Sequence, residues 1–131
     1  MKAFLKTTKK NLRELRSRRF FWITAILSLL LLAASPALIW WQLFPEAGAQ
    51  IAVPLHYNMH FGVDRFGPPW QLFSIPFVGL LVWLVSGIST LLLWSRDHVL
   101  SYVFSSSATV IEFILLIGTT FVVLLNLSYS V

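Results

Sequence analysis

The sequence predicts an all-α integral membrane protein with three transmembrane helices, a basic cytoplasmic N-terminal segment, and a structured extracytoplasmic loop between the first two helices. Of its 131 residues, 57% are hydrophobic and 11% are charged, whereas a soluble domain is about 25% charged. The apolar residues form three long runs, and eight of the ten Lys and Arg residues precede the first run. Composition, run length and charge asymmetry together indicate a multi-pass membrane protein.

Residues 1–19 form the basic leader, which holds these eight cations. They are Lys2, Lys6, Lys9, Lys10, Arg13, Arg16, Arg18 and Arg19. We expect the leader to lie on the cytoplasmic side and to contact anionic lipid. Phe4, Leu5, Leu12 and Leu15 can share one face of a helix on the membrane surface, but this weak stripe favours a flexible tail. The leader lacks the interleaved aromatic residues of a nucleic-acid site, so no nucleic acid is expected as a partner.

Residues 20–131 form the predicted membrane domain, with spans at about 20–44, 72–94 and 102–125. A helix of roughly 20 apolar residues crosses the hydrocarbon core. The loop between the first two spans, residues 45–71, holds only Arg65 as a basic residue, while the short second connection holds Arg96. The N-terminus is therefore expected inside, and the loop and the C-terminus outside. Cleavage of a signal peptide at Ala47-Gly48-Ala49 is an alternative, although the preceding apolar run is longer than a signal h-region.

The third span carries a polar seam. Ser105, Glu112, Thr119 and Asn126 recur every seven residues, with Thr109 on the flank, and this period puts them on one side of a helix. An ionised carboxylate in mid-membrane costs several kcal/mol, so Glu112 should face protein or trapped water. One interpretation is a proton or cation relay. The favoured one is a neutral Glu112 that hydrogen-bonds hydroxyls or a carbonyl and holds helices or protomers together.

The loop segment at residues 53–70 is the most polar part of the membrane domain. His56, His60 and Asp64 are spaced so that a helix would align them as zinc ligands. The surrounding prolines and glycines favour a compact loop with turns, in which Gly62 and Gly67 make the turns. We then expect a hydrogen-bonded network of His56 with Asp64 and with Asn58. Zinc at His56, His60 and Asp64 is the alternative, and no other cofactor is expected.

The sequence contains no recognised catalytic motif. It has no nucleophile elbow, phosphate-binding loop or His-Glu-x-x-His zinc motif, and it has no cysteine. A His-Asp pair without a nucleophile or metal is an incomplete site. We therefore expect a protein that is not an enzyme.

The run Pro54-Leu55-His56-Tyr57-Asn58, followed by Gly62 and Asp64, resembles the P-x-H-[W/Y]-N…G…D motif of SdpI-like bacterial membrane proteins. It is similar also to small uncharacterised bacterial membrane proteins with an HYN…FG-[V/I]-D loop. The resemblance covers about 50 residues and carries over Pro54, His56, Asn58, Gly62 and Asp64 as motif positions. It implies the bacterial inner membrane and, in some members, immunity to a secreted toxic peptide or signalling of its presence.

Three functions follow as hypotheses. The leading one is a structural, recognition or accessory membrane protein that presents the loop outside, in contact with the bilayer and in a homo-oligomer or larger membrane complex. The second is a small transporter or ion-conducting oligomer that uses Glu112. The third is a metal-dependent membrane enzyme built on His56, His60 and Asp64.

Overall fold

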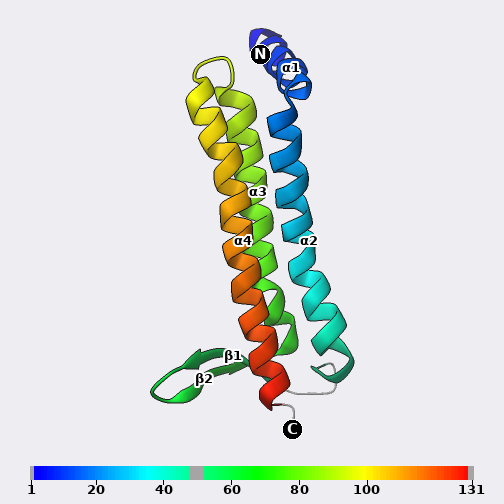
Figure 1. Ribbon diagram of the computed structural model, residues 1–131, viewed down its shortest axis with the longest axis vertical. Coiled ribbons are helices and arrows are strands. Elements are labelled where there is room, and N and C mark those ends of the chain that lie inside the picture. Colours follow the sequence, from blue (N-terminus) through cyan, green and yellow to red (C-terminus); the bar gives the residue numbers. More distant parts are fainter. Residues whose placement is uncertain (1, 48–51, 130–131) are drawn as a thin grey trace.

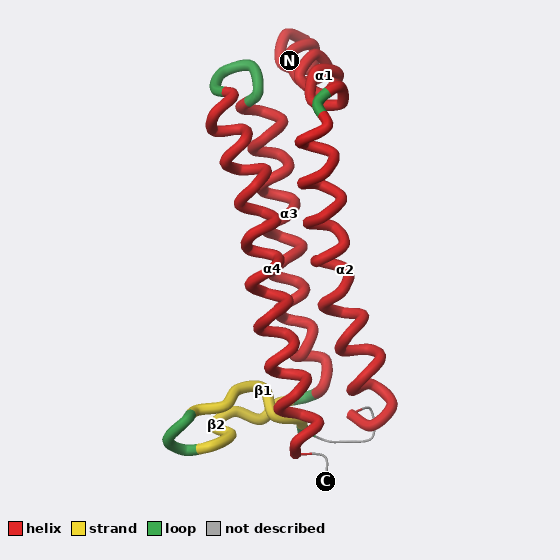
Figure 2. Tube along the Cα trace, viewed as in Figure 1, coloured by secondary structure: helices red, strands yellow, loops and turns green. Residues whose placement is uncertain are grey.

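The computed structural model describes residues 2–47 and 52–129, and it consists of three long helices with a short helix at one end and a β-hairpin at the other (Figures 1 and 2). The elements in chain order are α1 (Lys2–Ser17), α2 (Arg19–Ala47), β1 (Val53–Asn58), β2 (Gly62–Gly67), the 3-10 helix η1 (Pro69–Phe73), α3 (Ser74–Leu93) and α4 (His98–Tyr129). Three helical segments, Arg19–Leu43, Pro69–Leu93 and His98–Ser128, are long and apolar enough to cross a membrane. The predicted set of three membrane-spanning helices is confirmed in these terms.

Helices α2 and α4 extend beyond the predicted apolar runs at both ends, whereas α3 lies within its run. Helix α4 has 32 residues and is about 48 Å long, whereas the hydrocarbon core is about 30 Å thick. It begins at His98 because the Asp97 carboxylate accepts a hydrogen bond from the backbone N–H of Leu100 at 3.0 Å, which satisfies one free donor of the first turn. Hydropathy locates the apolar part of a span, but capping and packing locate the ends of its helix.

Helix α4 is the centre of the bundle, since it packs against both α2 and α3. The outward faces of all three long helices are apolar, as at Leu30, Phe77 and Phe113, which are all more than half exposed. Apolar surface of this extent needs an apolar surrounding. Lipid supplies that surrounding for a bundle of membrane spans.

Two apolar clusters close the ends of the bundle. The cluster at the hairpin end consists of Ile39, Leu43, Val53, Leu72 and Val123. The cluster at the α1 end consists of Leu15, Phe21 and Trp94. Between them the buried side chains include polar residues, among them Ser28, Ser86 and Glu112. The hairpin is therefore seated on an apolar base, and the polar seam lies between two apolar layers.

The leader is a helix, whereas the sequence favoured a flexible tail. Leu15 packs against Phe21 and Trp94 at the end of the bundle, while Phe4, Leu5 and Leu12 of the predicted stripe are more than half exposed. Of the four stripe residues only Leu15 is buried, so contacts at the end of the bundle, and not the stripe as a whole, decide the position of α1.

The basic leader and the hairpin lie at opposite ends of the bundle. Figure 1 shows α1 and the α3–α4 connection at one end of the bundle, and the hairpin with the C-terminal end of α4 at the other. Gly48 and Ala49 of the proposed cleavage pattern lie outside the described residues.

Candidate functional site: the hairpin and its seat on the bundle

The loop motif folds as an antiparallel β-hairpin, in which β1 pairs with β2. Asn58 accepts a hydrogen bond at its Oδ1 from the backbone N–H of His60 at 3.0 Å, a contact typical of asparagine in turns. Gly62 has a φ of 75°, a conformation that glycine adopts without steric cost. Asn58 and Gly62 thus define the ends of the turn, and the predicted turn at Gly62 is present.

His56 and Asp64 face each other across the two strands. The His56 Nδ1 atom lies 2.7 Å from the Asp64 Oδ1 atom, so the predicted hydrogen bond between these side chains is confirmed. The helical alignment that suggested zinc ligands is wrong, because the residues belong to opposite strands. Asn58 does not join the pair, since its side-chain oxygen binds the turn backbone instead.

The pair is accessible from outside the protein. Side-chain exposure is 63% for His56 and 35% for Asp64. An exposed contact between two polar side chains of this kind contributes little to stability, about 0–1 kcal/mol. The geometry therefore leaves the His56 ring available for a partner, with the Asp64 carboxylate fixing its orientation.

His60 belongs to the turn and not to the pair. Across residues 2–47 and 52–129, no three His, Asp or Glu side chains lie close enough together to hold a metal ion. The hairpin brings together only two of the three side chains named as possible zinc ligands.

The base of the hairpin is fixed by burial and by a hydrogen bond. Val53 is completely buried in the apolar cluster at this end. Asn126 of α4 donates from Nδ2 to the carbonyl oxygen of Pro54 at 2.7 Å, and this contact is buried. A buried carbonyl without a partner would cost about 1–3 kcal/mol. Asn126, the last residue of the polar seam, therefore joins α4 to the motif loop.

Gly67 allows the second strand to lie close to η1. A Cβ atom at this position would lie 2.5 Å from Leu55 Cδ1 and 2.6 Å from Gln71 Oε1. The sequence assigned Gly67 to a turn, but among the described residues only Gly62 has a positive φ. Close packing accounts for Gly67, which corrects that assignment.

The tip of the hairpin is apolar and exposed. Met59 is 85% exposed and Phe61 is 83% exposed, and Figure 1 shows the hairpin projecting sideways from the bundle. Tyr57 and Phe66 on the strands are also more than half exposed. The hairpin combines a buried base with a projecting apolar tip, an arrangement suited to contact with another surface.

The rest of the polar seam faces the bundle, as the seven-residue spacing predicts. Ser105 and Thr109 both reach Thr24 of α2: the two hydroxyl oxygens of Ser105 and Thr24 are 2.6 Å apart, and Thr109 donates to the Thr24 carbonyl at 3.3 Å. Thr119 is buried but donates to Leu115 of its own helix at 2.9 Å. The seam therefore connects α4 to α2 at one end and to the hairpin at the other.

Glu112 is buried, with 1% of its surface exposed. Its Oε1 atom has no hydrogen-bond partner, so the predicted bonds of this atom to hydroxyls or carbonyls are absent. The carboxyl group instead lies against Gly79 of α3, where Leu32 of α2 also approaches. The bundle of a single chain thus encloses the Glu112 side chain.

Several structural contacts were not identified from the sequence. Glu14 accepts a hydrogen bond from the Trp94 indole at 2.8 Å, and Asn11 donates to the Leu91 carbonyl at 2.9 Å. Both contacts hold α1 against α3. The presence of Glu14 and Asn11 among many cations was the only hint in the sequence. Their partners lie about 80 residues away along the chain, so the contacts become visible only in the folded structure.

In comparisons with known proteins, the chain matches no protein-family model, no curated protein and no solved structure.

Proposed function

We propose that this chain is a small, non-catalytic protein of the bacterial inner membrane, with its N-terminus inside and its C-terminus outside, which uses the hairpin as an external recognition element. The resemblance of Pro54, His56, Asn58, Gly62 and Asp64 to the SdpI-like loop motif supports the bacterial setting and a role related to immunity or signalling. The partner, on this proposal, is another protein or peptide at the outer surface of the membrane.

The orientation follows from charge. Eight cations lie in the leader, and Lys and Arg near a span favour the cytoplasmic side. The leader and the hairpin lie at opposite ends of the bundle, which supports an external hairpin. Reporter fusions at Gln50, His98 and the C-terminus should lie outside, inside and outside respectively, and a cytoplasmic signal at Gln50 would reverse the orientation.

The combination of a fixed base and an exposed apolar tip supports the recognition role. The hairpin is fixed at its base by the buried hydrogen bond from Asn126 to Pro54, yet its tip exposes Met59 and Phe61 almost fully. An isolated two-stranded hairpin is only marginally stable in water. A fixed base reduces the ordering cost of binding, because the hairpin is already held in one conformation.

Site-specific photo-cross-linking in living cells tests this role. A photoreactive residue at Phe61 should give a discrete protein or peptide adduct, and the same residue at Leu30, an exposed apolar position in the middle of α2, should not. Asn126→Ala should weaken the adduct at position 61 because it releases the base of the hairpin. Equal labelling at positions 61 and 30, or no protein adduct at 61, would contradict the recognition role.

The burial of Glu112 favours a second candidate, a proton or ion relay in a small transporter. An ionisable side chain within a span is a functional candidate, and its Oε1 atom lacks a partner. Glu112→Gln keeps the size of the side chain but cannot release a proton. Loss of proton flux into proteoliposomes with an unchanged fold would favour the relay, and unchanged behaviour in both measurements would favour a structural role.

A further inference from the structure

We propose that the groove between the hairpin and the outer face of α4 is a binding site for one phospholipid molecule. This inference uses the membrane placement proposed above but does not depend on the recognition role of the hairpin tip. It assigns a ligand to the groove that the motif strand β1 forms with α4.

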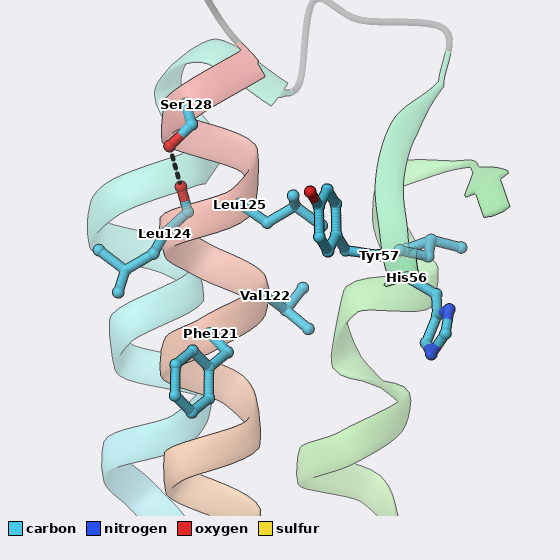
Figure 3. Close-up of a pocket in the computed structure, with 8 residues that line it drawn as sticks. His56, Tyr57, Phe121, Val122, Leu124, Leu125 and Ser128 are labelled. Atoms are coloured by element: carbon cyan, nitrogen blue, oxygen red, sulfur yellow. Dashed lines mark hydrogen bonds between the residues drawn. The ribbon is translucent and has the colours of Figure 1, made fainter. Parts of the chain in front are cut away.

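The groove has a volume of about 650 Å³. Leu55, His56 and Tyr57 of β1 form one wall, and Phe121, Leu124 and Leu125 of α4 form part of the other. Figure 3 shows the Tyr57 ring beside Leu125, whereas the His56 ring points away from Leu125. The space is of the size that holds a small ligand or part of a larger one.

The position of the groove favours lipid. Phe121 and Ser128 are seven residues apart on α4, which corresponds to about 10 Å along the helix axis. These residues lie in the last two turns of a segment able to span a membrane, His98–Ser128. Phe121 and Leu124 are more than half exposed, so the groove opens toward the surroundings of the bundle. At this depth those surroundings are acyl chains and the adjoining headgroups.

One polar group of the groove suits a phosphate. Tyr57 is more than half exposed, and Figure 3 shows its hydroxyl beside Leu125, toward the Ser128 end of the groove. Tyrosine is enriched at membrane interfaces because its ring is apolar and its hydroxyl is polar. An acyl chain along Phe121 and Leu124 would place the headgroup at that end, where the Tyr57 O–H can donate to a phosphate oxygen.

Native mass spectrometry of the purified chain tests this site, with dioleoylphosphatidylethanolamine and dioleoylglycerol as probes. The wild-type chain should bind one phospholipid with higher affinity than further molecules. Leu124→Trp fills the groove and should weaken this first binding at least tenfold. Ile114→Trp is the matched control, because Ile114 is an exposed apolar residue of α4 outside the groove.

Tyr57→Phe gives a second, milder test that preserves the ring. A hydrogen bond to a charged group corresponds to about tenfold in affinity or more. The variant should therefore bind phosphatidylethanolamine about tenfold more weakly and dioleoylglycerol, which has no phosphate, as the wild type does. Equal effects of Leu124→Trp and Ile114→Trp would overturn the proposal, as would equal phospholipid affinity in Tyr57→Phe and the wild type.

One further outcome would assign the groove to another occupant. A dimer that disappears with Leu124→Trp, without any tight phospholipid, would mean that a second copy fills the groove. The recognition role is measured separately at Phe61 in cells, so the two proposals can fail independently.

Discussion

Replacing Gly79 with alanine tests how closely α3 and α4 pack around Glu112. A Cβ atom at position 79 would lie 2.7 Å from Glu112 Oε2 and 3.1 Å from Leu32 Cδ1. Neither separation is compatible with normal van der Waals contact, so at least one neighbour has to move. Because Gly79 and Glu112 belong to different helices, the substitution should push α3 and α4 apart unless the Glu112 side chain yields.

The magnitude follows from the room available to Glu112. Overpacking a core costs typically 1–3 kcal/mol. The carboxyl group is the end of a flexible side chain, which lowers the cost, but Glu112 is only 1% exposed and has little space to enter. We therefore expect the steric clash in Gly79→Ala to lower the free energy of unfolding by about 1 kcal/mol, apart from any change in helix propensity.

Gly87→Ala is the matched control on the same helix. A Cβ atom at Gly87 would meet no atom within 4 Å, so this variant changes the backbone propensity without a clash. Alanine is favoured over glycine in helices by about 0.8–1 kcal/mol in water, and both variants share any such gain. The difference between Gly79→Ala and Gly87→Ala therefore isolates the steric term.

The assay is SDS-induced unfolding of the purified protein in a mild detergent, followed by tryptophan fluorescence. The same substitutions are then made in a Glu112→Ala background, where the carboxyl oxygens are gone. The steric cost at position 79 should fall by about 1 kcal/mol, because residues in contact are coupled in a double-mutant cycle. Equal destabilisation by Gly79→Ala in both backgrounds, or equal effects of Gly79→Ala and Gly87→Ala, would show that Glu112 does not limit the packing of α3 against α4.

Three other predictions concern contacts at the two ends of the bundle. His56→Ala and Asp64→Ala should each weaken the hairpin by up to about 1 kcal/mol, and the double mutant should lose less stability than the sum of the two single losses. His60→Ala should have a smaller effect. Damage at all three positions together with a zinc-dependent rise in melting temperature would indicate a metal site. Asn126→Ala should destabilise the protein by about 1–3 kcal/mol, because the buried Pro54 carbonyl loses its donor; limited proteolysis should then cut the hairpin faster, and an unchanged cleavage rate would contradict this anchor. Glu14→Ala should free α1 from α3 by removing the acceptor of the Trp94 indole. Amide hydrogen exchange in α1 should then be faster than in the wild type. Unchanged exchange would show that the apolar contacts of Leu15 suffice to hold α1 in place.

Much of the candidate site was accessible from local pattern. Its turn at Gly62 follows from the conformational freedom of glycine, and the bond between His56 and Asp64 follows from two complementary polar side chains in one short loop. The strand pairing did not follow, because the i, i+4, i+8 spacing fits a helix as well as the two facing strands of a hairpin.

The three long apolar helices and the inward face of α4 could be predicted from the amino-acid sequence. These features depend on hydrophobic length and on a seven-residue period, both of which are local along the chain. The seam residues Ser105, Thr109 and Asn126 accordingly make the inter-element contacts that their spacing favours.

The contacts between helices could not be predicted from the sequence and depend on the packing of the bundle. Asn126 binds Pro54, Glu112 lies against Gly79, and Glu14 binds Trp94. Each contact joins elements that are distant in sequence, so its partner depends on how the helices rotate and cross. Hydrophobic length does not set that rotation, because the outward faces of the three long helices are all apolar and would be solvated equally well by lipid. Steric fit at small residues such as Gly79 and the pairing of buried polar groups set it instead.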